Sequence, residues 1–201
     1  MKKILPLFSY VFHPIFIPVY AALFYFFLND SYFTDTEKTF AILQIAVITI
    51  AAPILMFFAL RASGQIDSIM IAEISQRKTP LIILCFLTML LIRKSITIEH
   101  FPELYFFFLG GLLSTFIALL LLFIKIKASL HMIAISTLTV FAFGLTIHNQ
   151  TPNINIIALL VIINGFVASS RLEMNAHTPK ELAIGLAIGI IPQLLVFYFW
   201  L

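Results

Sequence analysis

The chain has 201 residues, of which 62% are hydrophobic and 10% are charged, and its formal net charge is +3. A mean hydropathy of +1.10 excludes an ordinary soluble globular domain, so the composition predicts an integral membrane protein. The small net charge and the lack of a basic tract argue against a protein that binds nucleic acid.

Apolar runs long enough to cross a bilayer recur along the whole chain. Each crossing needs about 20 mostly apolar residues, which is too long for a barrel strand. Because the bilayer core offers no water to the backbone, each run must satisfy its own hydrogen bonds as a helix. We therefore predict an all-α fold, a polytopic membrane bundle of about six to seven transmembrane helices in a single domain, residues 1–201. The expected spans are 4–28, 38–60, 80–96, 104–126, 130–147, 154–170 and 180–201.

The first span contains two prolines, Pro14 and Pro18. Each removes a helix hydrogen bond, so we expect a kinked span that is retained rather than cleaved as a signal peptide. His13 precedes the first proline and is expected to bond a freed carbonyl group or to lie at the membrane interface.

The second and third spans also contain prolines. Pro53 predicts a kink within the second span. Pro80 follows the longest linker, residues 61–79, and we expect it to open the third helix, because proline is favoured in a first turn.

Small and polar residues in later spans predict helix contacts. Gly110 and Gly111 in the fourth span should permit the close approach of a neighbouring helix. Asn164 is a polar residue deep in the sixth apolar run, and we expect it to bond another helix.

Positive charge is distributed unequally between the two sides of the predicted spans. Lys38, Arg93 and Lys94 lie on one side, and the other nine lysine and arginine residues lie on the opposite side. Those nine are Lys2, Lys3, Arg61, Arg77, Lys78, Lys125, Lys127, Arg171 and Lys180. Since cytoplasmic loops are rich in Lys and Arg, we expect the N-terminus and the nine-charge side to face the cytoplasm, in the bacterial cytoplasmic membrane.

Three segments on the nine-charge side carry residues suited to phosphate chemistry. They contain Arg77, then residues 127–131, then residues 170–181. Histidine can act as a nucleophile or an acid because its pKa lies near working pH, and arginine grips phosphate through a planar fork. Helix N-termini add unpaired N–H donors. Two spans separate each segment from the next, so all three should lie on one side of the membrane.

The last of these segments reads Ser-Arg-Leu-Glu-Met-Asn-Ala-His-Thr-Pro-Lys-Glu over residues 170–181. It resembles the third motif of the type 2 phosphatidic acid phosphatase superfamily, Ser-Arg-x5-His-x3-Asp. Ser170, Arg171 and His177 match in register, and Glu181 stands where the motif has aspartate.

Weaker similarities extend the resemblance over residues 70–185. Residues 128–131, Ala-Ser-Leu-His, are similar to the second motif, Pro-Ser-Gly-His, without its proline and glycine. Arg77 corresponds to the arginine of the first motif, Lys-x6-Arg-Pro, whose lysine position is occupied by Met70. Two spans separate these motifs here, whereas the usual pattern has none between them.

The resemblance implies a membrane-embedded phosphatase that hydrolyses a lipid phosphate or prenyl diphosphate without a metal or other cofactor. His177 would be the nucleophile, Glu181 its orienting carboxylate and His131 the acid for the leaving group, with a phosphohistidine intermediate. The residues expected to hold the phosphate are Arg171, Ser170, Ser129, Lys127 and Arg77. The implied partners are the substrate and membrane lipids, with no nucleic acid, and a homo-oligomer is left open.

Other interpretations of the same residues stay open. Residues 178–181 have the pattern of a capping box, so one alternative is that Glu181 caps the last helix and has no other role. Ser129 can likewise be no more than an N-cap. Lys127 can be an interface anchor. A metal site built from His131, His177 and Glu181 is a further alternative.

Two other functions also stay open. The incomplete first and second motifs favour a catalytically inactive relative that binds lipid phosphates. The proline-kinked spans suit a small membrane transporter.

Overall fold

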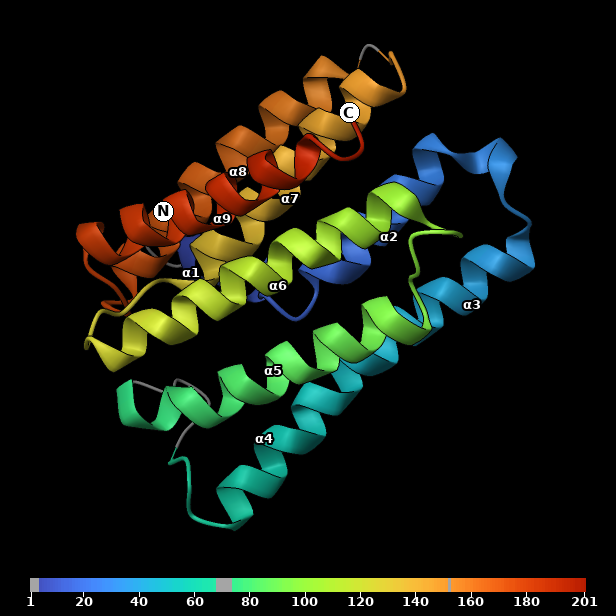
Figure 1. Ribbon diagram of the computed structural model, residues 1–201. Coiled ribbons are helices and arrows are strands. Elements are labelled where there is room, and N and C mark those ends of the chain that lie inside the picture. The colour runs from blue at the N-terminus through green and yellow to red at the C-terminus, as the bar shows by residue number, and fades with distance from the viewer. Residues whose placement is uncertain (1–3, 68–73, 152) are drawn as a thin grey trace.

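The computed structural model describes residues 4–67, 74–151 and 153–201, and every regular element in these ranges is helical. Figure 1 shows long helices lying beside one another as a bundle. The elements are α1 (Leu5–Val11), α2 (Ile17–Leu28), η1 (Asp30–Tyr32), α3 (Asp35–Ala46), η2 (Val47–Ala51), α4 (Ala52–Ala62), α5 (Ile74–Lys94), α6 (Pro102–Phe123), α7 (Leu130–His148), α8 (Ile154–Glu173) and α9 (Pro179–Phe197).

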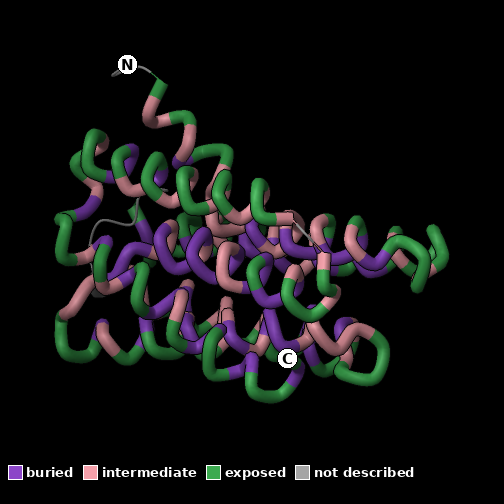
Figure 2. The backbone as a smooth tube through the Cα atoms, turned by 90° about the horizontal axis from the view of Figure 1, so that it is seen from above, coloured by how far each residue is buried: buried purple, intermediate pink, exposed green. Residues whose placement is uncertain are grey.

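Within the described ranges, five helices are long and apolar enough to cross a membrane: Asp35–Ala62, Pro102–Phe123, Leu130–His148, Ile154–Glu173 and Pro179–Phe197. Large apolar side chains are exposed on outer turns, for example Leu159, Val161 and Ile162 of α8. Figure 2 shows buried residues in the interior of the bundle and exposed residues on its outer turns. An apolar surface of this kind fits contact with lipid. The predicted all-helical architecture is confirmed for the described residues, with five candidate membrane-spanning helices where six to seven were expected.

The first predicted span is broken rather than kinked. Helix α1 ends at Val11 and α2 begins at Ile17, with Pro18 in its first turn, where the missing N–H costs least. His13 lies in the break, and its Nδ1 accepts a hydrogen bond from Ile15 N at 3.4 Å. The expected bond from His13 to a freed carbonyl is therefore not the one formed.

The prolines of the second and third predicted spans lie within helices. Pro53 follows a π-helical turn, Val47–Ala51, between α3 and α4. Pro80 lies inside α5, so the expectation that it opens this helix is wrong. Gln76 Nε2 donates to the Asp67 carboxylate at 2.6 Å, and this bond fastens the additional N-terminal turns of α5 to the preceding loop.

Two expected helix contacts are present. A Cβ atom at Gly110 would clash with the side chain of Gln193, whose Nε2 donates to Phe107 O at 2.8 Å and joins α9 to α6. Asn164 Nδ2 of α8 donates to Thr139 Oγ1 of α7 at 2.7 Å. Gly111, by contrast, has open space beside it.

Helices α7 and α9 approach closely at their N-terminal ends. A Cβ atom at Gly185 would lie only 2.6 Å from the carbonyl oxygen of Ser129. Ser129 N in turn donates to Glu181 O at 3.2 Å. Small residues allow such close helix packing, and here it places the starts of α7 and α9 side by side.

We expect Gly185→Ala to lower the free energy of unfolding by about 1–3 kcal/mol, because its methyl group would press on the Ser129 backbone. The measurement is the melting temperature in detergent micelles. Gly165→Ala is the matched control, since nothing lies within 4 Å of a Cβ atom there, and it should be neutral or stabilising by up to about 1 kcal/mol. Equal melting temperatures for the two variants would contradict this account of the packing.

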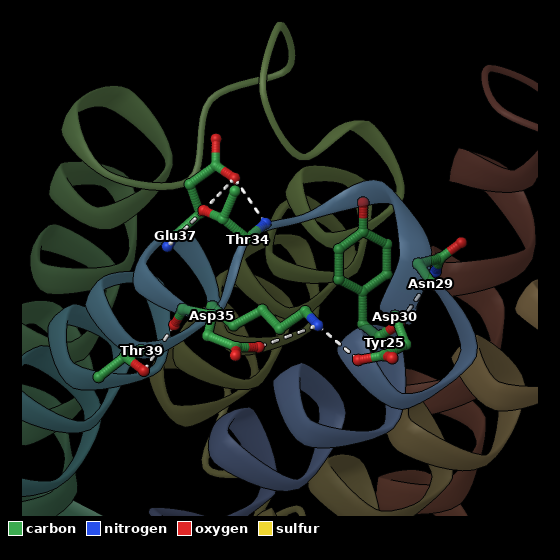
Figure 3. A network of polar contacts seen from close by, with 8 residues as sticks. Tyr25, Asn29, Asp30, Thr34, Asp35, Glu37 and Thr39 are labelled. Atoms are coloured by element: carbon green, nitrogen blue, oxygen red, sulfur yellow. Dashed lines mark hydrogen bonds and ion pairs between the residues drawn. The ribbon is translucent and has the colours of Figure 1, made fainter.

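The turn between α2 and α3 is held by local polar contacts (Figure 3). Thr34 and Glu37 form a reciprocal capping box at the start of α3. Lys38 forms ion pairs with Asp30 and Asp35. The capping box satisfies the N–H groups of Thr34 and Glu37. This turn lies at the end of the bundle away from the α6–α7 connection.

Candidate functional site

The three segments predicted to hold phosphate meet at one end of the bundle. Figure 1 places the start of α5, the α6–α7 connection and the α8–α9 connection at that same end. This agrees with the expectation drawn from the number of spans between them. We call the following residues the polar end cluster: Arg77, Lys127, His131, Arg171, His177 and Glu181.

His177 lies in the connection that precedes α9, and its side chain is only 3% exposed. Its Nδ1 is 2.7 Å from Glu181 Oε2. Since a carboxylate can only accept, the ring donates from Nδ1 and keeps the lone pair on Nε2. No residue in the described ranges hydrogen-bonds Nε2. An oriented imidazole nitrogen of this kind can act as a nucleophile or base.

Glu181 combines the two roles that the sequence left as alternatives. Its Oε2 accepts from His177 and also from Thr178 N at 3.4 Å, while Glu181 N donates to Thr178 Oγ1 at 3.3 Å. The predicted capping box is therefore confirmed. The cap fixes the carboxylate at the helix start, so the same oxygen can orient the imidazole one turn earlier.

Lys127 joins the α6–α7 connection to the α8–α9 connection. Its Nζ donates to Ala176 O at 3.0 Å and lies 3.8 Å from Glu181 Oε2. Ser129, two residues later, is fully buried, and its Oγ accepts from Met132 N at 3.5 Å as the N-cap of α7. The ammonium group of Lys127 thus belongs to the site, whereas the hydroxyl of Ser129 is oriented toward its own helix.

Arg171 lies in the last turn of α8 and is 9% exposed. Its Nη1 makes only a weak contact with Met174 Sδ at 3.8 Å, and its buried Nε has no hydrogen-bond partner. No carboxylate within the described ranges forms a salt bridge with it. A buried guanidinium without an anionic partner is costly, and a bound anion would remove much of that cost.

The charge of Arg171 acts on several rings. It contributes to the electrostatic environment of His13, His131 and His177. Arg77, in the first turns of α5, likewise acts on His177 and Lys127. Arg77 of α5, Arg171 of α8 and Lys127 of the α6–α7 connection thus concentrate positive charge at one place.

Burial lowers the pKa of His177 below its ordinary value of 6.5, and the hydrogen bond to Glu181 opposes this effect. The charges of Lys127 and Arg171 lower that pKa further. Burial, followed by the charge of Arg77, also lowers the pKa of Lys127. His177 is therefore neutral at neutral pH, the form that a nucleophile requires.

We expect the stability of the protein to fall as the pH drops below about 6.5, in part because of His177. Between its ordinary and its folded pKa, the unfolded chain binds a proton that the folded chain resists, so stability rises with pH there. The contribution of neutral His177 to the free energy of unfolding is fully present above pH 6.5, and it is lost as the pH falls through the pKa of His177 in the folded protein. Melting curves of the wild type and His177→Gln in micelles at several pH values measure it. Identical pH dependence in the two proteins would contradict the shift.

Helix α1 contacts His131 of the cluster and Ser170 of α8. His131 Nε2 donates to Ser9 O at 3.1 Å, and Ser9 Oγ lies 2.6 Å from Ser170 Oγ. The ring of His13 packs edge-on against His131, with centroids 5.1 Å apart. The predicted phosphate ligand Ser170 is thus engaged with α1.

Sequence reasoning did not assign Ser9 or His13 to the site. The clearest signal was His13-Pro14, which marks a break in an apolar run and so a place where the chain can fold back. Met70, the lysine position of the first motif, lies outside the described residues.

The described residues contain no group of three or more His, Cys, Asp or Glu side chains arranged to hold a metal ion. The alternative metal site from His131, His177 and Glu181 therefore has no geometric support. In this arrangement Glu181 contacts His177 and Lys127, while His131 contacts α1.

Comparison with known proteins adds no assignment. No protein-family model matches this chain, and searches among curated proteins and solved structures also find no match.

Proposed function

We propose that the protein is a membrane phosphatase that hydrolyses a lipid phosphate or prenyl diphosphate with His177 as nucleophile and without a metal cofactor. It would be a divergent member of the type 2 phosphatidic acid phosphatase superfamily. The observation that best supports this proposal is the buried His177, oriented by Glu181, near Arg171, which forms no salt bridge with a carboxylate of the described residues.

In the proposed reaction, Arg171 and Lys127 bind the nonbridging phosphate oxygens and stabilise their charge in the transition state. His177 Nε2 attacks phosphorus as the bond to the leaving oxygen breaks, forming a phosphohistidine. Water then attacks phosphorus as the P–N bond breaks, and the ring of His131, neutral after the first step, takes a proton from that water. Inorganic phosphate is released, and the P–N electron pair returns to the imidazole of His177. Glu181 holds the ring throughout and stabilises the positive charge that develops on it.

His131 would protonate the leaving oxygen. Its Nε2–H is donated to Ser9 O, so the proton must come from Nδ1 of a ring that is an imidazolium when the bond breaks. The cost of charging a ring close to Arg171 would be offset by the negative charge of the bound phosphate.

The membrane arrangement proposed for this function has six to seven spans, with α5 and the α1–α2 pair added to the five apolar helices. The polar end cluster would face the cytoplasm, because the described lysine and arginine residues are more numerous at this end. The membrane would be the bacterial cytoplasmic membrane.

A second candidate function is binding of lipid phosphates without turnover. It is favoured by the hydrogen bond from His131 Nε2 to Ser9 O, which leaves only one of the two ring nitrogens of the proposed acid for the leaving oxygen. A protein of this kind would use Arg171 and Lys127 to hold a headgroup and would release no phosphate.

The test is phosphate release from phosphatidate, phosphatidylglycerol phosphate and prenyl diphosphates by purified protein in micelles containing a metal chelator. Time-dependent release from at least one substrate is expected. Binding without release, measured with the same lipids, would instead support the second candidate. Neither binding nor release would reject both functions.

A further inference from the structure

A cavity of about 130 Å³ lies within the bundle, among α2, α5, α6 and α7. Small side chains form much of its wall, including Thr88 of α5, Gly111 and Thr115 of α6, and Ala134 and Thr137 of α7. Nothing lies within 4 Å of a Cβ atom built on Gly111. The bundle therefore leaves space here that a larger residue at position 111 would occupy.

The chemistry of the wall favours an apolar occupant. Each of its four threonines already donates its hydroxyl to a backbone carbonyl, so none needs a polar ligand. The pairs are Thr49 to Ile45 at 2.8 Å, Thr88 to Leu84 at 2.9 Å, Thr115 to Gly111 at 2.8 Å and Thr137 to Gly189 at 3.3 Å. A polar occupant or an ordered water would find few partners, whereas a hydrocarbon would contact methyl groups, proline rings and phenylalanines.

Two helices, α5 and α7, carry residues of both the cavity wall and the polar end cluster. On α5, Arg77, Leu84 and Thr88 are spaced seven and four residues apart and so share one helix face. At 1.5 Å per residue, the wall residue Thr88 lies roughly 16 Å along the helix from Arg77. On α7, the wall residue Ala134 is one turn from His131.

We propose that this cavity holds one hydrocarbon chain of the phosphorylated lipid, with Gly111 providing the room for it. The position of the headgroup in this assignment rests on the proposed function. A volume of about 130 Å³ accommodates a segment of a single chain and not two chains side by side. The lipid phosphate is thus bound at two places, by charge at the polar end cluster and by apolar contact below it.

The experiment measures equilibrium binding of alkylphosphonates, whose C–P bond resists hydrolysis, to the protein in phosphatidylcholine nanodiscs. Each methylene group buried in the cavity should tighten binding about fourfold. Gly111→Leu should therefore weaken octylphosphonate binding by about tenfold or more and leave methylphosphonate binding within about twofold of the wild type.

Two further variants make the result decisive. Ala134→Leu narrows the cavity from α7 and should reproduce the effect, which protects the test against a fold defect in one variant. Gly165→Leu is the matched control, because Gly165 also has open space around it but lies on the outside of α8. It should bind both phosphonates like the wild type.

The outcomes separate this inference from the function on which it rests. Unchanged octylphosphonate binding in Gly111→Leu and Ala134→Leu would overturn the chain assignment alone. Equal weakening of both phosphonates would also overturn it, because the substitution would then act on the headgroup site. Failure of the wild type to bind either phosphonate would reject the headgroup site and the proposed function together.

Discussion

Replacement of His177 by alanine is expected to lower the kcat for phosphate release by at least about 10³-fold, because it removes the attacking nitrogen. Released phosphate is measured with the best lipid substrate in micelles. His148→Ala is the matched control, since His148 also pairs with a glutamate, Glu103, at 3.3 Å but lies at the opposite end of the bundle. It should retain the wild-type rate.

Substitutions of Glu181 test how the nucleophile is held. Glu181→Gln can keep the capping box, because glutamine also serves at this position, but it loses the charge that orients and stabilises the imidazole. We expect a lower kcat with little change in melting temperature. Glu181→Ala should lower both the kcat and the melting temperature, because loss of the cap costs about 0.5–2 kcal/mol of stability.

For the first of these variants, undiminished phosphate release in His177→Ala would remove His177 from the mechanism.

Arg171→Met is expected to weaken methylphosphonate binding by about 100-fold or more and, without ligand, to raise the melting temperature. The first effect follows from the loss of a buried, charged phosphate ligand. The second follows because the guanidinium is buried with no carboxylate partner in the described ranges, and an apolar side chain of similar length removes that cost. Replacing poorly paired buried charge by apolar residues can stabilise by about 1–4 kcal/mol.

The opposite directions of these two effects distinguish a ligand-binding arginine from a structural one. A structural arginine would lose stability when replaced, and its loss of binding would follow from unfolding. Arg61→Met is the matched control: Arg61 lies in the last turn of α4 and is exposed, so its replacement should affect neither property. A lower melting temperature in ligand-free Arg171→Met would show that Arg171 has a structural partner and would contradict its assignment as the anion ligand.

The sequence alone determined the features that depend on near neighbours along the chain. Its composition established the helical membrane class, because a backbone in lipid has few other options. The predicted span 130–147 nearly coincides with α7, Leu130–His148, since polar residues bound that apolar run sharply. The start of α5 was missed, because Arg77 and Lys78 lower the hydropathy of turns that are nonetheless helical.

The candidate site was only partly predictable, because only contacts between near neighbours along the chain follow from a local pattern. Residues 177–181 form a local unit, so their capping box and the imidazole–carboxylate pair follow from a spacing of four. The contacts of His131 with Ser9 and of Ser9 with Ser170 join residues 122 and 161 positions apart. No local pattern specifies such pairs, and they exist because the broken first span folds α1 against α8.

Only the tertiary structure decided which groups are satisfied and where space is left. Whether Arg171 has a carboxylate partner, and whether Gly111 meets a neighbour or a cavity, depends on how separate helices pack. Packing is a property of shapes in three dimensions, and a helix face in the sequence does not record what lies opposite it. The residue types of the site can therefore be read along the chain. That Arg171 lacks a carboxylate partner among the described residues, and that a cavity lies beside Gly111, appears only once the helices are assembled.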